Sequence, residues 1–288
     1  MDIRIIDYGS PDASRLFTHS LRDTGFAVLT NHTVPFDVVE RLWAEWLTFF
    51  KSDRKWGFEY GDGGQAGYRS MTGSEVAVGA AVKDIKEYFH FYPWGRNPSP
   101  EDGVAMELFR AGSALAATLL DWVQQETPDH VREGFSMPLP QMLTGSDRTL
   151  LRILHYPPLT GAEVPGSIRA AAHEDINLLT VLPSANEPGL QVQDLDGNWH
   201  DVPCDPGTVV VNCGDMLEVA SGGFYPSTTH RVLNPVGEGA KRSRVSTPLF
   251  LHPQDDVELL PGFTAFDFLN ERIKAITGQG LQRKNPAL

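Results

Sequence analysis

Cysteine is scarce in this sequence, since only Cys204 and Cys213 occur among its 288 residues. A secreted protein of this length could manage with one disulfide, so the cysteine count alone does not decide the compartment. Long apolar runs are also missing, and no segment approaches the roughly 20 residues of a membrane-spanning helix. The start of the sequence lacks the basic and then apolar stretches of a secretory signal. We therefore expect a cytoplasmic protein whose two thiols are reduced.

Basic residues are few as well: 24 Lys and Arg stand against 37 Asp and Glu, a formal net charge of −13. A protein that binds nucleic acid needs basic surface to displace counterions from phosphates. Anionic membranes likewise attract basic segments. We therefore expect neither nucleic acid nor a membrane as a partner, and the sequence carries no signal for the oligomeric state.

The pattern along the chain changes from helical to strand-like near residue 149. Residues 1–125 are rich in helical patterns, including a helix that begins at Ser10 and Pro11 and ends at Gly25. A Gly-rich stretch at 57–74 is expected to be a loop. No long linker follows, so we expect residues 1–288 to form a single compact unit.

Residues 149–255 contain short apolar runs bounded by Pro and Gly, a pattern typical of a sandwich or barrel of antiparallel strands. Asp196-Gly197 indicates a hairpin between two of these strands. A C-terminal helix and tail at 264–288, capped by Thr264, complete the chain. The predicted fold class is mainly β with flanking helices.

One of the nine histidines, His173, has a carboxylate two residues later, in His173-Glu174-Asp175. In an extended segment, residues i and i+2 point the same way, so His173 and Asp175 can face one point while Glu174 points away. An HxD triplet alone is common by chance. Here it directly precedes an apolar strand at 178–182, which strengthens it.

A second histidine, His230, lies 55 residues after Asp175 in the strand-like segment 227–232. Two histidines and one carboxylate form the facial triad that holds non-haem Fe(II) with open coordination positions. The alternative is an ordinary strand histidine that is hydrogen-bonded in the core.

Arg244 and Ser246 are also spaced i and i+2, at the start of an apolar strand. An arginine on the inner face of a barrel needs an anion, and guanidinium plus hydroxyl suits one carboxylate. Because this strand contains no acidic residue, a ligand carboxylate is one interpretation. The other is that Arg244 points outward and Ser246 has no special role.

Taken in order, these residues resemble the motifs of one family, the isopenicillin N synthase-like Fe(II)/2-oxoglutarate dioxygenases. The resemblance extends over nearly the whole chain. The matching segments are Asp23–Phe26, Asn31-His32, Lys83–Glu87, His155-Tyr156-Pro157-Pro158, His173-Glu174-Asp175, Asn212-Cys213-Gly214-Asp215, Ser227–Val232 and Arg244-Val245-Ser246.

The resemblance implies a double-stranded β-helix core, a cupin-like jelly roll, with the site in its mouth. It implies three iron ligands, which are His173, Asp175 and His230. It also implies that Arg244 and Ser246 bind the distal carboxylate of 2-oxoglutarate, and that Tyr156 touches this co-substrate. One departure is Leu154, which stands where many plant relatives have asparagine and removes one polar contact.

The activity implied by the resemblance is oxidation, most often hydroxylation, of a C–H bond in a small molecule. Fe(II), 2-oxoglutarate and O2 take part, and succinate and CO2 are released. Two alternatives are a same-fold Fe(II) oxidase that does not use 2-oxoglutarate, such as an oxidative cyclase, and a non-enzymatic jelly-roll binding module. We expect substrate contacts from Arg69 and the aromatic stretch 88–94, but no motif distinguishes hydroxylation from desaturation or cyclisation.

Overall fold

The computed structural model describes residues 1–59, 65–71, 82–99 and 102–281. The helices of this part are α1 (Ala13–Thr24), α2 (Phe36–Lys51), η1 (Asp53–Phe58), α3 (Val104–Glu126), α4 (Asp129–Arg132), α5 (Leu139–Met142), α6 (Asp215–Ala220), η2 (Gly237–Lys241) and α7 (Ala265–Thr277). The strands are β1 (Ile5–Asp7), β2 (Phe26–Thr30), β3 (Gly67–Arg69), β4 (Glu87–Phe91), β5 (Leu150–Tyr156), β6 (Ala170–His173), β7 (Leu179–Pro183), β8 (Leu190–Gln193), β9 (Trp199–Asp201), β10 (Val209–Cys213), β11 (His230–Val232), β12 (Arg244–Ser246), β13 (Leu249–Leu251), β14 (Glu258–Leu260) and β15 (Phe263–Thr264).

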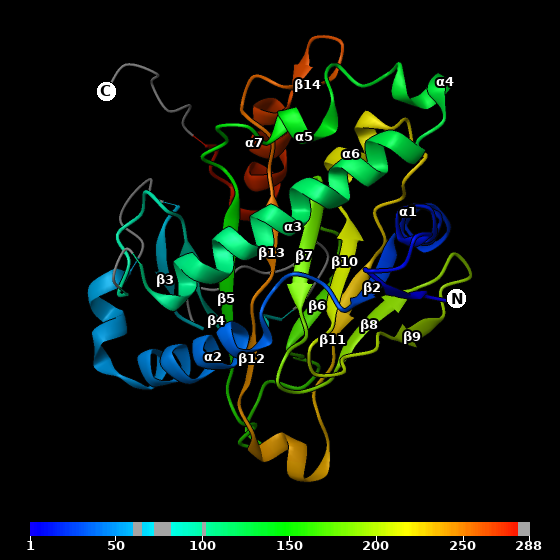
Figure 1. The fold of residues 1–288 in the computed structure, drawn as a ribbon. Helices are drawn as coiled ribbons and strands as arrows, with labels where there is room; N and C mark the ends of the chain where they lie inside the picture. Colours follow the sequence, from blue (N-terminus) through cyan, green and yellow to red (C-terminus); the bar gives the residue numbers. More distant parts are fainter. Residues whose placement is uncertain (60–64, 72–81, 100–101, 282–288) are drawn as a thin grey trace.

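Among the described residues, the strands form one large sheet, one small sheet and a two-stranded ribbon (Figure 1). The large sheet has the order β1-β2-β10-β7-β13-β5-β4-β3, with β12 also paired to β5, and the small sheet has the order β6-β11-β8-β9. All of these pairs are antiparallel except β1 with β2. The predicted antiparallel β core is therefore confirmed.

Strands of the large sheet are apolar on both faces because both faces are buried. In β10, Val209 and Val211 belong to the core between the sheet and the helices, whereas Val210 belongs to the core between the two sheets. The same alternation separates Ile153 from Leu154 in β5. A strand covered on both faces has an uninterrupted apolar sequence. This explains the short apolar runs of the second half of the chain.

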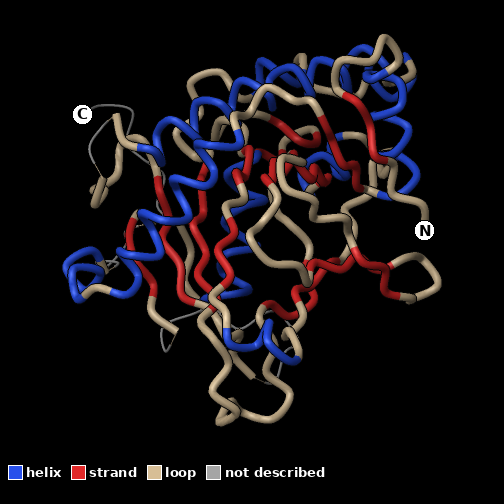
Figure 2. The backbone as a smooth tube through the Cα atoms, turned by 60° about the horizontal axis from the view of Figure 1, so that its bottom comes forward, coloured by secondary structure: helices blue, strands red, loops and turns tan. Residues whose placement is uncertain are grey.

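Helices from the N-terminal part cover the outer face of the large sheet. Figure 1 shows α3 crossing in front of β13 and β7, and Figure 2 shows most helical residues along one side of the strands. The buried face of α3 includes Leu108, Leu115 and Leu119, which recur at helical spacing and join the outer core. The small sheet packs against the inner face of the large sheet instead.

Helix α1 begins later than its sequence predicts, at Ala13 rather than at Ser10 and Pro11. The preceding residues form a turn instead, in which the backbone N–H of Gly9 donates to Asp7 Oδ1. The predicted end is confirmed, because Gly25 has a φ of 72° and its N–H donates to the carbonyl of Leu21. At the other end of the chain, the predicted cap Thr264 starts α7 with a capping box to Asp267.

The Gly-rich stretch predicted as a loop contains a strand, β3, which pairs with β4. Gly67 makes this possible with a φ of 131°, close against the carbonyl of Phe58. The parts of this stretch at 60–64 and 72–74 lie outside the described residues. Within the described ranges, no helix combines the length and apolarity that a bilayer crossing requires. Cys204 and Cys213 are free thiols.

Candidate active site

Three potential metal ligands meet where β6 and β11 lie side by side (Figure 1). The antiparallel register places His230 directly opposite His173, and their ring centroids are 4.4 Å apart. Asp175 follows the end of β6, and its Oδ1 lies 4.0 Å from His173 Nε2 and 3.7 Å from His230 Nε2. One ligand atom from each residue lies within 4.8 Å of the other two. The structure thus joins the three residues that the sequence motifs single out.

Backbone carbonyls orient both imidazole rings. Nδ1 of His173 donates to the carbonyl of Ala171 at 2.8 Å, and Nδ1 of His230 donates to that of Thr228 at 3.1 Å. In this tautomer each Nε2 carries a lone pair. Both Nε2 atoms can therefore donate a lone pair to a divalent cation at the point where Asp175 Oδ1 approaches them.

The carboxylate of Asp175 is oriented by side chains from two strands of the large sheet. Its Oδ2 accepts a hydrogen bond from Thr180 Oγ1 at 2.5 Å and one from Asn212 Nδ2 at 2.8 Å. Thr180 Oγ1 in turn accepts from Asn177 Nδ2 at 2.9 Å. Because Oδ2 is engaged, Oδ1 is the oxygen that faces the histidines. Thr180 was not among the predicted site residues, and Asn212 was predicted only as part of a family motif.

The protonation states favour cation binding at neutral pH. Burial, together with the neighbouring His230, lowers the pKa of His173 to about 4. Burial would raise the pKa of Asp175, but the two histidines and the bonds from Asn212 and Thr180 outweigh it and lower that pKa. A neutral imidazole and a charged carboxylate are the forms that ligate metals.

Arg244 and Ser246 are both buried, with 2% and 3% exposure. The pairing of β12 with β5 places Arg244 opposite Tyr156 and Ser246 opposite Leu154, which lie in the core between the sheets. Arg244 therefore does not point outward. Its Nε donates to the carbonyl of Glu187 at 2.9 Å, whereas its Nη1 is buried without a partner in the described structure.

A second interior arginine, Arg169, was missed by the sequence analysis. It is 0% exposed, and its guanidinium carbon lies 5.8 Å from the ring centroid of Tyr156. That of Arg244 lies 5.2 Å from the same ring. The sequence signal that could have found it is its position directly before Ala170–Ala172. Like Arg244, an arginine next to an apolar strand needs an anion if it faces the interior.

Two motif histidines have structural contacts that explain why they are not ligands. His155 Nδ1 lies 2.7 Å from Glu87 Oε1, its Nε2 lies 3.0 Å from Ser243 Oγ, and its ring stacks on Phe50. His32 Nδ1 accepts the backbone N–H of Val34 at 3.2 Å. Neither residue was included in the predicted ligand set, and neither joins the cluster.

His252, buried close to Asp175, provides a test of the electrostatics. Burial lowers its pKa to about 4, against about 6.5 in an unfolded chain. As the pH falls from 7 to 5, the unfolded state takes up a proton that the native state does not, so stability falls. We expect the titration of His252 to lower the free energy of unfolding by about 2 kcal/mol between pH 7 and pH 5.

Urea unfolding of the metal-free protein at pH 7 and pH 5 measures this effect. His252→Gln should lose about 2 kcal/mol less than the wild type between the two pH values. The exposed His130→Gln should retain the full pH dependence. An unaltered pH dependence in His252→Gln would show that its imidazole is not buried in the neutral form.

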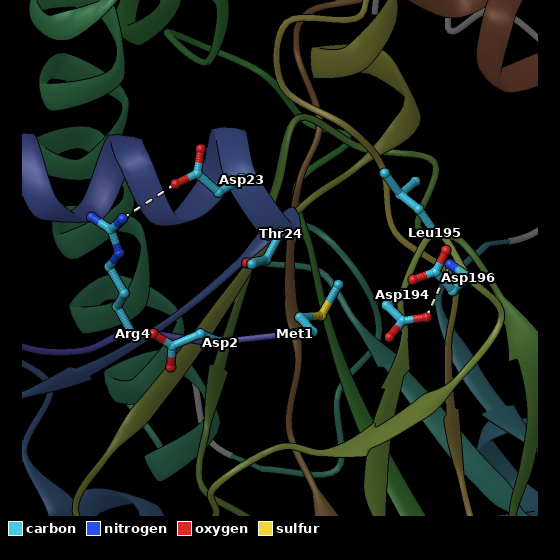
Figure 3. Close-up of a pocket in the computed structure, with 8 residues that line it drawn as sticks. All are labelled: Met1, Asp2, Arg4, Asp23, Thr24, Asp194, Leu195 and Asp196. Atoms are coloured by element: carbon cyan, nitrogen blue, oxygen red, sulfur yellow. Dashed lines mark hydrogen bonds and ion pairs between the residues drawn. The ribbon is translucent and has the colours of Figure 1, made fainter.

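Figure 3 shows a surface pocket of about 350 Å³ that is lined by Met1, Asp2, Arg4, Asp23, Thr24, Asp194, Leu195 and Asp196. Its lining includes four aspartates and Arg4, which is ion-paired with Asp23 at 3.2 Å. The triad residues, Arg244 and Ser246 are not among the residues that line it. This pocket is therefore formed by residues other than those of the site described above.

Comparisons with known proteins agree with the geometry. The model of the 2OG-Fe(II) oxygenase superfamily matches residues 148–253, and that of the N-terminal region of non-haem dioxygenases in morphine synthesis matches residues 3–108. A 2-oxoglutarate-dependent dioxygenase of Didymella fabae is 30% identical over 268 residues, which cover 82% of this chain and 78% of that protein.

Solved structures extend the comparison to the fold. A putative oxygenase from Shewanella oneidensis is 48% identical, with a TM-score of 0.86 and coverage of 95% of this chain and 98% of that one. A Neurospora crassa protein in complex with alpha-KG and thymine is 25% identical, with a TM-score of 0.72 and coverage of 90% and 89%. The chain therefore belongs to the 2OG-Fe(II) oxygenase superfamily and is a dioxygenase with a double-stranded β-helix core that uses Fe(II), 2-oxoglutarate and O2.

Proposed function

We propose that His173, Asp175 and His230 hold the Fe(II) of this dioxygenase. Two imidazoles and one carboxylate, converging within 4.8 Å, are the donor set of a facial triad. Their hydrogen bonds to Ala171, Thr228 and Asn212 set the ligating atoms before the metal arrives. This convergence is the observation that carries the proposal.

The proposed co-substrate site consists of Arg244, Ser246 and Tyr156. Arg244 and Ser246 share the inner face of β12, and the unpartnered Nη1 of Arg244 offers a donor to a carboxylate of 2-oxoglutarate. The ring of Tyr156 lies beneath the guanidinium. Bound together at this site, Fe(II) and 2-oxoglutarate would oxidise a C–H bond with O2 and release succinate and CO2.

The substrate that we propose is a small molecule placed against the inner face of β4 and β5. Tyr88 of β4 belongs to the core between the sheets, and the guanidinium carbon of Arg152 lies 4.8 Å from its ring centroid. The Neurospora crassa relative, whose structure contains thymine, supports a small molecule as the substrate class. Arg69 is adjacent, since it pairs with Tyr88 across β3 and β4.

The whole chain is proposed to act as one unit. The core on the outer face of the large sheet combines residues of α1, α2 and α3 with residues of β5, β7 and β10. The helices of the region 1–125 therefore pack against the sheet that carries the site in the region 149–255. Helix α7 belongs to the C-terminal segment 264–288, which follows this region in sequence.

An anaerobic titration tests the assignment of the site. Fe(II) is added to the metal-free protein and then 2-oxoglutarate, and the weak visible charge-transfer band of the chelate is followed. A band that saturates with 2-oxoglutarate is the expected result. Iron binding without a band would favour the oxidase that does not use 2-oxoglutarate, and absence of iron binding would refute the ligand set.

The residue that orients Asp175 gives a second test. We expect Asn212→Ala to weaken Fe(II) binding by about 10- to 100-fold, because Asp175 Oδ2 loses its amide donor. The exposed hairpin variant Asn198→Ala is the matched control and should bind Fe(II) like the wild type. Fe(II) affinities measured by anaerobic competition with a chelator decide between these outcomes, and equal affinities would contradict the role of Asn212.

A further inference from the structure

Arg169 places a second guanidinium next to the proposed 2-oxoglutarate site. It lies directly before β6 of the small sheet, whereas Arg244 lies on β12 of the large sheet. Both guanidinium groups lie within 6 Å of the ring centroid of Tyr156, at 5.8 and 5.2 Å. Two guanidinium groups, one next to the small sheet and one on the large sheet, thus share one aromatic neighbour in the interior.

Each of the two arginines is anchored by a backbone carbonyl and has donors left over. Nη2 of Arg169 donates to the carbonyl of Arg242 at 3.1 Å, and Nε of Arg244 donates to that of Glu187 at 2.9 Å. Within the described ranges, Nε and Nη1 of Arg169 and Nη1 of Arg244 are buried without a hydrogen-bond partner. Buried, unpaired donors on a cation are strongly unfavourable unless an anion meets them.

The protein supplies no such anion from the part that the structure describes. Glu187 is the carboxylate electrostatically coupled to both arginines, but Arg242 engages it at 2.6 and 3.0 Å. Burial, and then the charge of Arg244, lower the pKa of Arg169 to about 10, so Arg169 stays protonated at neutral pH. The described residues therefore leave the two arginines without a counterion, and a ligand carboxylate would supply one.

We propose that Arg169 and Arg244 together bind the distal carboxylate of 2-oxoglutarate, one guanidinium from each sheet. This inference rests on the proposed function, in which Arg244 and Ser246 alone hold that carboxylate. Two carboxylate oxygens have about four acceptor positions, enough for the three unpartnered N–H nitrogens and the Ser246 hydroxyl. Arg169 is then a residue that determines specificity for 2-oxo acids with a second carboxylate.

The test compares two acids of the same chain length, 2-oxoglutarate and 2-oxopentanoate, which lacks the distal carboxylate. Their dissociation constants are measured by anaerobic calorimetry on the Fe(II)-loaded wild type and on Arg169→Met, Arg169→Lys and Arg244→Met. The melting temperature of each variant is measured without any 2-oxo acid. Circular dichroism confirms that each variant is folded.

We expect Arg169→Met to weaken 2-oxoglutarate binding by about tenfold or more and to leave 2-oxopentanoate binding nearly unchanged. It should also raise the melting temperature in the absence of ligand, because an unpaired buried charge has been removed. Arg169→Lys, which keeps the charge without the planar fork, should lie between Arg169→Met and the wild type. A purely structural role would lower the melting temperature and weaken both acids alike.

The outcomes separate this inference from the function on which it rests. If Arg244→Met changes the ratio of the two dissociation constants but Arg169→Met does not, Arg169 does not contact the co-substrate. If neither variant changes the ratio, the carboxylate site itself is misplaced and the proposed function fails with it. The two-arginine site is supported if the dissociation constant for 2-oxopentanoate, divided by that for 2-oxoglutarate, falls in both Arg169→Met and Arg244→Met. Arg169→Met should then also have a higher melting temperature than the wild type.

Discussion

Asp175→Ala is expected to weaken Fe(II) binding by more than about 100-fold and to reduce succinate formation to background. Loss of residues that only orient a ligand typically costs 10- to 100-fold in metal affinity, so loss of a ligand itself should cost more. Among the described residues, Asp175 supplies the carboxylate of the cluster, and its removal leaves two uncharged-ligand side chains, the imidazoles of His173 and His230, to hold a divalent cation. Iron affinity and succinate release are measured on the same preparation.

The matched control for this variant is the neighbouring Glu174→Ala. Glu174 stands between His173 and Asp175 in sequence, but it is exposed, and its Oε1 accepts a hydrogen bond from Thr229 Oγ1. We expect this variant to retain iron and succinate formation. Retention of tight Fe(II) binding in Asp175→Ala would contradict the triad, and loss in both variants would indicate a general disturbance of the loop.

Arg244→Met is the second variant with a large expected effect. It should weaken 2-oxoglutarate binding by about 100-fold, or about 3 kcal/mol, because charge-assisted hydrogen bonds to a buried carboxylate are lost. Fe(II) affinity should stay within a factor of about three, because Arg244 is not among the clustered metal-binding residues. The pattern expected in turnover is therefore a higher requirement for 2-oxoglutarate in a protein that still retains iron.

Arg110→Met is the control for this second variant. Arg110 lies on α3, is exposed, and its Nη1 lies 3.6 Å from Asp102 Oδ1. Its loss should leave 2-oxoglutarate affinity unchanged, because exposed ion pairs contribute little. If Arg244→Met bound 2-oxoglutarate like the wild type, the assignment of Arg244 to the co-substrate site would be wrong.

Part of the site could be predicted because it depends on spacing within one extended segment. His173 and Asp175 face one point, and Arg244 and Ser246 share a face, since alternate residues of an extended chain point the same way. The cap at Thr264 and the turn at Gly25 are local in the same sense. The start of α1 was predicted wrongly because Ser10 and Pro11 could begin a helix or, as here, complete a turn after Asp7.

Other parts depend on contacts between segments far apart in the chain. The register of β11 against β6 sets His230 opposite His173, and no local pattern specifies that register. Thr180 and Asn212 reach Asp175 because β7 and β10 are neighbours in the large sheet. Arg169 is the clearest case, because nothing around it in sequence shows that Tyr156 and Arg244 share its surroundings.

The sequence by itself determined the family motifs, the strand-rich second half and the residue types able to hold Fe(II) and a carboxylate. Tertiary structure alone decided which hydrogen bonds orient Asp175, which of the motif histidines stay in structural contacts, and that two arginines meet in one interior site. The physical reason is that period-two and period-3.6 patterns fix the direction of a side chain from its own element. The partner that it meets is decided only when the sheets close on each other.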